Sequence, residues 1–121
     1  MYIGIDLGTS GVKALLIDDD QTAVASGQAA LDVSRPQAGW SEQDPAHWIV
    51  AVEAAVAELK KSHPRDLAAV KGIGLSGQMH GATLLDSGDR VLRPCILWND
   101  TRSHAEAAAL DADPRFRRIT G

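Results

Sequence analysis

Cysteine, aromatic residues and basic charge are all scarce in this sequence of 121 residues. The single cysteine, Cys95, excludes an internal disulfide and fits a reducing cytoplasm. Lys and Arg number 12 against 16 Asp and Glu, and this net charge of −4 argues against sequence-independent binding of nucleic acid. No apolar run approaches the roughly 18 residues that span a bilayer, and the first residues lack the basic and apolar regions of a signal peptide. We therefore expect a cytoplasmic protein that binds neither membrane nor nucleic acid.

The length bounds the number of domains. A chain of 121 residues is one domain or part of one. It can bury about two thirds of its surface, which is enough for one core but not for two lobes that close on a substrate. The composition, 45% hydrophobic and 23% charged, is typical of a globular protein. Cys95, between Pro94 and Ile96, is predicted to be a small core residue.

The start of the chain has the pattern of a β-meander. Ile3, Ile5 and Leu7 alternate with small or polar residues, which is the period of a strand. The compact turn at 8–11 indicates a hairpin, and the acidic turn at 18–20 precedes a third β run that contains Gly27. The predicted strands are 2–7, 12–17 and 22–32.

The rest of the chain adds helices and short strands. Asp44 can cap a helix in which Pro45 occupies the first turn, and Pro64 is predicted to stop it. Ser103 and Glu106 have capping-box spacing before a second, alanine-rich helix. Further predicted elements are a loop at 33–43, a buried strand at 70–75, and short strands at 82–85 and 90–92 around a turn at 86–89. This order predicts an α/β fold with a mixed sheet.

Residues 6–13 carry groups that are suited to bind phosphate and a hydrated metal ion. Asp6 ends an apolar strand, where burial of a bare carboxylate is costly, so a functional reason for it is expected. Glycines let backbone N–H groups approach an anion, hydroxyls add donors, and a lysine adds a cation. The predicted phosphate-binding residues are Gly8, Thr9, Ser10, Gly11 and Lys13. Asp6 suits Mg²⁺ held through water, since Mg²⁺ keeps several waters and binds few carboxylates. The alternative is an ordinary glycine-rich turn.

A second polar segment follows the strand that ends at Leu75. Ligands bind beyond the carboxyl ends of strands in open α/β sheets. Gln78 and His80 offer polar contacts to hydroxyl groups, and Met79 offers an apolar surface to the carbon face of a sugar. Further along, Asp100 is a candidate substrate contact, with helix capping as the alternative.

These motifs resemble those of a known superfamily. Residues 2–13 are similar to the first phosphate motif of the actin, hexokinase and Hsp70 superfamily, and within it to the FGGY carbohydrate kinases. Four further segments, at 34–36, 39–45, 74–81 and 92–102, resemble bacterial xylulose kinases of that family. The resemblance implies an actin/hexokinase/Hsp70-like (ribonuclease H-like) mixed sheet with helices, here as an incomplete first domain.

The resemblance also implies an activity for the full-length enzyme. That enzyme would transfer a phosphoryl group from MgATP to D-xylulose, giving D-xylulose 5-phosphate. Asp6 would be the catalytic group that organises Mg²⁺ through water, residues 8–13 would bind phosphate, and the sugar would contact Gln78, Met79, His80 and Asp100. In this family the general base and the adenosine pocket come from segments after residue 121. We therefore expect residues 1–121 alone to be inactive and marginally stable, and the full-length form to be a possible homodimer.

Two alternatives stay open. One is another FGGY kinase that acts on ribulose, gluconate or a different polyol. Glycerol is disfavoured, because glycerol kinases have an arginine–glutamate pair where this chain has Met79 and His80. The other is a nucleotide-binding module without kinase activity, against which the resemblance around Met79 and His80 counts.

Overall fold

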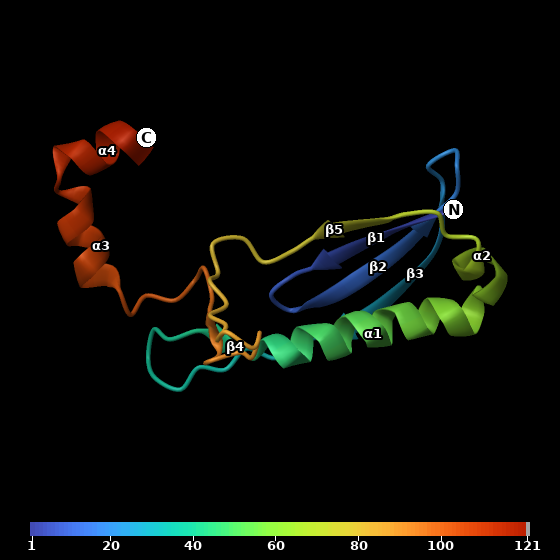
Figure 1. Cartoon of the computed structure of the whole chain (residues 1–121), viewed down its shortest axis with the longest axis horizontal. Coiled ribbons are helices and arrows are strands. Elements are labelled where there is room, and N and C mark those ends of the chain that lie inside the picture. The colour runs from blue at the N-terminus through green and yellow to red at the C-terminus, as the bar shows by residue number, and fades with distance from the viewer. Residues whose placement is uncertain (121) are drawn as a thin grey trace.

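The computed structural model describes residues 1–120, and its first half is a sheet packed on one long helix (Figure 1). Strands β1 (Tyr2–Leu7), β2 (Gly11–Ile17) and β3 (Ala23–Ala30) form an antiparallel meander. Strand β5 (Ile73–Ser76) pairs in parallel with β1, which gives the order β3-β2-β1-β5. The predicted meander and mixed sheet are therefore confirmed.

Helix α1 (Pro45–Ser62) covers one face of the sheet. The Asp44 carboxylate accepts a hydrogen bond from the Ala46 N–H at 2.9 Å, as predicted for an N-cap. The two lysines of its last turn and Pro64 lie where the sequence predicted its end. Pro64 also begins a short helix, α2 (Pro64–Ala68), because proline suits a first helical turn as well as it ends the preceding one.

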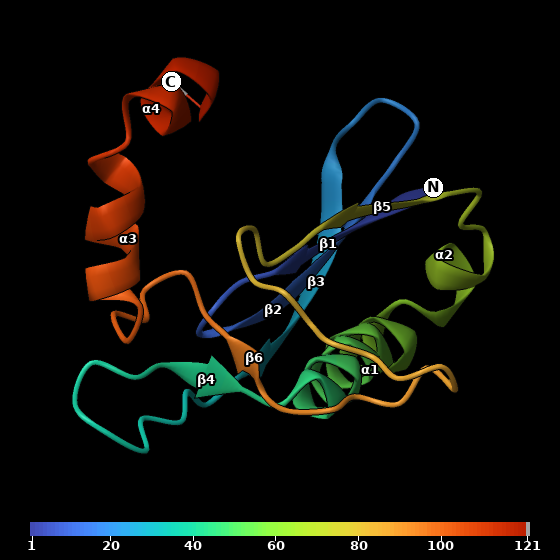
Figure 2. The ribbon, with the colours of Figure 1, turned by 60° about the vertical axis from the view of Figure 1, so that its left-hand side comes forward.

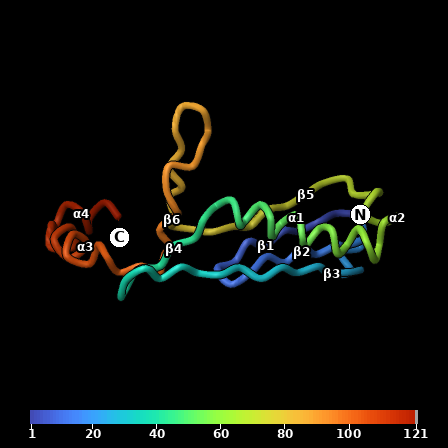
Figure 3. Tube along the Cα trace, turned by 90° about the horizontal axis from the view of Figure 1, so that it is seen from below, coloured from blue at the N-terminus to red at the C-terminus, as the bar shows by residue number. Residues whose placement is uncertain are grey.

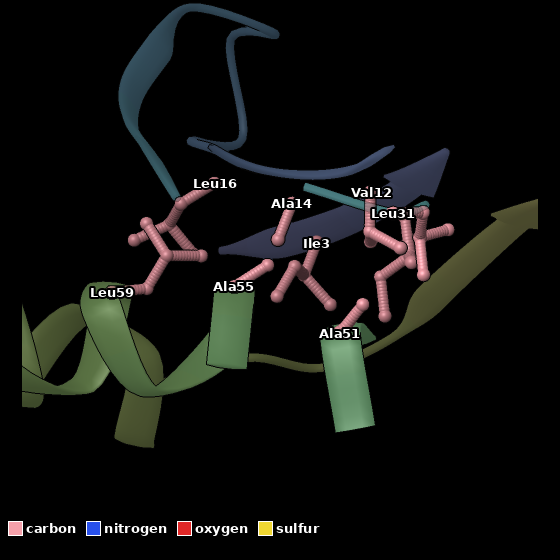
Figure 4. Packing of buried hydrophobic residues seen from close by; sticks show 9 residues of the cluster. Ile3, Val12, Ala14, Leu16, Leu31, Ala51, Ala55 and Leu59 are labelled. Atoms are coloured by element: carbon pink, nitrogen blue, oxygen red, sulfur yellow. The ribbon is translucent and has the colours of Figure 1, made fainter. Parts of the chain in front are cut away.

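The core lies between α1 and the sheet (Figure 4). Alternate residues of β1 and β2 point toward the helix, and small residues of the helix let it approach closely. At Gly27 a Cβ atom would overlap the backbone of Ala55, so the glycine that looked like a strand interruption is a helix contact. The buried core residues are Ile3, Ile5, Val12, Ala14, Leu16, Leu31, Ala51, Ala55 and Leu59.

The second half of the chain is more open. Strands β4 (Glu42–Gln43) and β6 (Cys95–Ile96) form a small antiparallel sheet beside the main one (Figure 2). Helices α3 (His104–Asp111) and α4 (Pro114–Thr120) lie apart from the main sheet and α1. Cys95 is 1% exposed, which confirms its prediction as a core residue.

Three predictions about this half were wrong. Strand β5 is exposed along its whole length rather than buried, since α1 does not extend over this edge of the sheet. Within residues 1–120, the segments 82–85 and 90–92 form no regular strands, although a bridge between Leu85 and Val91 and a hydrogen bond from the Leu92 N–H to the Leu84 carbonyl pair them locally. This segment projects from the body (Figure 3), where its leucines find no apolar face to cover. The turn at 86–89 does form, because the Asp86 carboxylate accepts from the Gly88 and Arg90 N–H groups.

The predicted capping box is also absent from the described chain. Ser103 is the N-cap of α3, but its side chain makes no capping hydrogen bond. Its φ and ψ of −95° and 19° depart from the extended conformation that an N-cap usually adopts. Among the helices of residues 1–120, none combines the length and apolar character needed to cross a membrane.

Candidate functional site

The turn between β1 and β2 and the segment after β5 form the two walls of one cleft. They meet because β1 and β5 are parallel neighbours, with Asp6 opposite Ser76, so both chains leave the sheet at the same edge. The cleft has a volume of about 360 Å³. Its lining residues are Asp6, Leu7, Gly8, Thr9, Ser76, Gly77, Gln78, Met79, His80 and Trp98. The structure thus brings Asp6 and part of the predicted phosphate set together with the predicted sugar segment.

The remaining phosphate-binding candidates lie next to this cleft rather than in it. Ser10, Gly11 and Lys13 line a neighbouring hollow of about 410 Å³ that also includes Gln28. Asp6 borders both spaces, and it faces Lys13 across the hairpin in the strand register. Its side chain is solvent-accessible at the end of β1. Asp6 is therefore placed to contact an ion in either space.

The Thr9 hydroxyl joins the two walls of the cleft. It accepts a hydrogen bond from Gln78 Nε2 at 3.4 Å and another from Trp98 Nε1 at 3.3 Å. An indole N–H can only donate, and a hydroxyl has two acceptor lone pairs and one hydrogen. With both lone pairs engaged in this way, the O–H hydrogen of Thr9 is left to donate to a ligand in the cleft.

Met79 and His80 are presented to solvent at the cleft. Met79 is 74% exposed, so its side chain can contact the carbon face of a ligand in the cleft. His80 has a φ of 62°, in the left-handed region that few side chains other than those of Asn, Asp and His tolerate. Such backbone conformations carry strain and cluster at ligand sites.

Asp100 lies outside the lining of the cleft as far as the described residues show. Its side chain is 2% exposed and forms a close ion pair with Arg102, Nη2 to Oδ2 at 2.7 Å. Oδ2 also accepts from the Ser41 N–H, and Oδ1 accepts from the Arg102 Nε and N–H. The Arg102 guanidinium holds the pKa of this carboxyl well below its usual range. The Asp100 carboxylate thus joins the loop at Ser41 to the segment before α3.

Arg102 also contacts Glu42 and Trp40, and the sequence did not predict these contacts. Its Nη1 lies 2.8 Å from Glu42 Oε1, and its guanidinium carbon lies 3.6 Å from the ring centroid of Trp40. Arg93 reaches the same Glu42 oxygen at 3.0 Å. These partners are distant in sequence, so only the tertiary structure shows that they form one cluster.

Gln43 is a second residue whose contacts the sequence did not predict, although it lies in the segment 39–45 that carries the family resemblance. It is 3% exposed, yet all of its amide is hydrogen-bonded. Nε2 donates to the Thr9 carbonyl at 2.8 Å and to the Asp32 carbonyl at 3.1 Å, and Oε1 accepts from Trp48 Nε1 at 3.0 Å. In the sequence Gln43 stands between Glu42 and Asp44, and no spacing there indicates that its amide would bind the Thr9 and Asp32 carbonyls.

The donor set fits a hydrated metal ion rather than a closed metal cage. Within residues 1–120, no group of three His, Cys, Asp or Glu side chains is placed to hold a metal. One accessible carboxylate, that of Asp6, borders the phosphate-binding candidates. This suits Mg²⁺, which binds through one or two carboxylates while it keeps water and phosphate ligands.

Known proteins resemble the whole chain. The N-terminal domain of the FGGY family of carbohydrate kinases matches residues 1–121. The xylulose kinase of Escherichia coli (strain K12) is 53% identical over 122 residues, which cover 100% of this chain and 25% of that protein. A xyloylose kinase from Brucella ovis has a TM-score of 0.95 at 68% identity, covering 98% of this chain and 25% of that one.

A solved structure with lower sequence identity has the same fold over most of the chain. The xylulose kinase from Rhodospirillum rubrum has a TM-score of 0.85 at 37% identity, covering 92% of this chain and 23% of that one. The chain therefore spans about a quarter of the length of the relatives it matches. The resemblance and the fold class predicted from the motifs are confirmed. The chain belongs to the FGGY family of carbohydrate kinases, whose N-terminal domain it matches throughout.

Proposed function

We propose that the protein to which this chain belongs phosphorylates D-xylulose with MgATP, giving D-xylulose 5-phosphate. The observation that carries this proposal is the single cleft that joins the β1–β2 turn to residues 78–80. A kinase must bring a phosphate donor and an acceptor hydroxyl together, and the cleft does this with residues from two parallel strands. The relatives named as xylulose kinases support the choice of sugar.

On the donor side, the β1–β2 turn binds the phosphates of ATP. Gly8 and Thr9 act from the cleft, and Ser10, Gly11 and Lys13 act from the neighbouring hollow. Asp6 holds Mg²⁺ through water, and the bound ion would neutralise phosphate charge. Phosphoryl transfer depends mostly on positioning and electrostatic stabilisation, so these groups need little covalent chemistry.

On the acceptor side, residues after β5 bind the ketose. Gln78 and His80 hydrogen-bond its hydroxyl groups, and Met79 covers its carbon face. Asp100 remains a predicted sugar contact, although its oxygens already accept four hydrogen bonds from Arg102 and Ser41. A sugar hydroxyl could therefore reach it only by sharing those donors.

The test is ADP formation by the purified full-length protein with D-xylulose. We expect Asp6→Asn to lower kcat by about 100- to 1,000-fold, because removal of one preorganised electrostatic group costs about that much. Asp20→Asn is the matched control, since Asp20 is an exposed residue in the turn before β3. Parent-like turnover of Asp6→Asn would contradict the role of Asp6. Parent protein without xylulose-dependent ADP formation would contradict the proposal as a whole.

A second candidate substrate is gluconate. A gluconate kinase from Lactobacillus acidophilus has a TM-score of 0.83 at 28% identity with this chain. The same assay with D-xylulose, D-ribulose, gluconate and glycerol separates the candidates by kcat/KM, because the pattern of hydroxyl contacts decides transition-state binding. We expect D-xylulose to give the highest value. A higher value for gluconate would move the assignment to that substrate.

A further inference from the structure

Gln43 is a buried amide that joins the β1–β2 turn to the segment after β3 and to α1. Its Nε2 donates to the carbonyl of Thr9 in the turn and to the carbonyl of Asp32 after β3. The two carbonyls belong to different parts of the chain, so one side chain joins them. Removal of that side chain would leave two partly buried carbonyl groups without this donor, which costs stability where water cannot replace it.

The orientation of this amide is set by Trp48. The indole Nε1–H can only donate, so the atom of Gln43 that faces it must be Oε1. This fixes Nε2 on the side of Thr9 and Asp32. Trp48 itself packs against the core from α1, so the amide is oriented by a group that the core immobilises.

The contact with Thr9 fixes the orientation of a peptide plane in the turn. In a trans peptide the C=O and the next N–H point in opposite directions. Because the Thr9 carbonyl is directed toward Gln43, the N–H of Ser10 is directed away from it. The next carbonyl, that of Ser10, is held by the Leu31 N–H at 2.9 Å. Successive carbonyls of the turn are thereby held by the body of the protein.

The same residue, Thr9, carries the hydroxyl that links the two walls of the cleft. Its backbone is held by Gln43 from one side, and its Oγ1 accepts from Gln78 and Trp98 on the other. A shift of the Thr9 backbone would therefore also move the hydroxyl. An anion-binding turn binds more tightly when its donors are already oriented before the ligand arrives.

We propose that Gln43 is a positioning residue of the phosphate-binding turn, which holds the Thr9 carbonyl and so aims the Thr9 hydroxyl and the Ser10 N–H for a nucleotide phosphate. This inference rests on the proposed function, since it takes the turn to bind the phosphates of ATP. Gln43 does not line the cleft, and its contact with the turn is made through the Thr9 carbonyl.

Gln43→Glu tests this in the full-length protein. It preserves the shape and the acceptor for Trp48 but replaces the Nε2 donor with an oxygen facing two carbonyls. Gln37→Glu is the matched control, since Gln37 is exposed in the loop before β4. We expect the KM for MgATP to rise about tenfold, which corresponds to about 1.4 kcal/mol, while the KM for D-xylulose changes less than about twofold.

Amide hydrogen exchange gives a readout that does not need turnover. We expect faster exchange at residues 8–11 in Gln43→Glu and unchanged exchange at 51–59 in α1. If Gln43→Glu fails to fold, Trp48→Phe is used instead. It removes the donor that orients the amide and is expected to raise the KM for MgATP less.

The possible failures can be told apart. A parent enzyme that forms no ADP with any sugar overturns the proposed function. An active parent, combined with a variant that equals it in both exchange at 8–11 and the KM for MgATP, overturns the role of Gln43. An equal rise in both KM values also overturns it, because that would indicate general loosening of the site.

Discussion

The two halves of the chain are held together in different ways. Nine of the buried apolar residues come from the first half and form one core, whereas only Cys95 and Leu97 are buried apolar residues of the second half. Large apolar side chains of the second half, such as Leu75 at 80% and Ile119 at 81%, are exposed instead. The site straddles this difference. The β1–β2 turn adjoins the packed core, whereas the segment at residues 78–80 follows the exposed edge strand β5.

Outside the apolar core, hydrogen bonds and ion pairs join segments that are distant in the sequence. Glu42, Arg102 and Asp100 join the loop before α1 to the segment before α3, and Gln43 joins the same loop to the β1–β2 turn. Residues 78–80 follow the exposed strand β5 and are joined to the β1–β2 turn by the hydrogen bond from Gln78 to Thr9. This segment is therefore expected to open more readily than the β1–β2 turn, which adjoins the packed core.

The largest expected effect comes from the core. Leu16 is fully buried on β2, and Leu16→Ala should lower the free energy of unfolding of the 121-residue chain by about 2–5 kcal/mol, because it leaves a cavity. Leu75→Ala on the exposed β5 is the matched control and should cost less than about 0.5 kcal/mol. Urea denaturation measures both. Equal losses would show that the β5 edge is covered in solution, and the contrast between the halves would fail.

A second, smaller effect is expected from acid. Because Arg102 lowers the folded-state pKa of Asp100, this carboxylate stabilises the fold above its unfolded pKa of about 4, and that stability is lost as the pH falls through this value toward the folded pKa. Asp100→Asn should be less stable than the parent at pH 7 and should lose less stability between about pH 5 and pH 2.

Asp113→Asn is the comparison for this effect. The pKa of Asp113 is also lowered by its arginine, Arg115, but that pair is exposed and screened by solvent. Its substitution should leave the acid unfolding curve nearly unchanged. If the two variants have the same acid profile, the burial of Asp100 does not distinguish the two ion pairs.

The smallest effect concerns the helix caps. Asp44→Ala should destabilise the chain by about 1 kcal/mol, because the carboxylate caps α1 through the Ala46 N–H. Ser103→Ala, at the N-cap of α3, should cost only a few tenths, since the Ser103 side chain makes no capping bond in the described chain. Thermal unfolding followed by circular dichroism compares them. A larger loss for Ser103→Ala would mean that the capping box predicted from the sequence forms in solution.

Local patterns predicted the elements that pack against the core. The alternation in β1, the turn at 8–11 and the cap at Asp44 depend on neighbours in the sequence, and all three appear in the structure. The failures lie where local preference had no apolar face to support it. Residues 82–85 have strand character but project into solvent, and the Ser103 cap starts a helix that lies apart from the core.

The sequence by itself determined the meander, the first helix, the family and the residue types of the site, because these depend on periodicity and on short contiguous motifs. Only the tertiary structure decided that Thr9 bridges the two walls of the cleft, that Gln43 holds it, and that Asp100 is engaged by Arg102 and Ser41. Thr9 and Gln78, for instance, are 69 positions apart. They meet because β5 returns parallel to β1, and the sheet register, rather than any local preference, sets which side chains come within hydrogen-bonding distance.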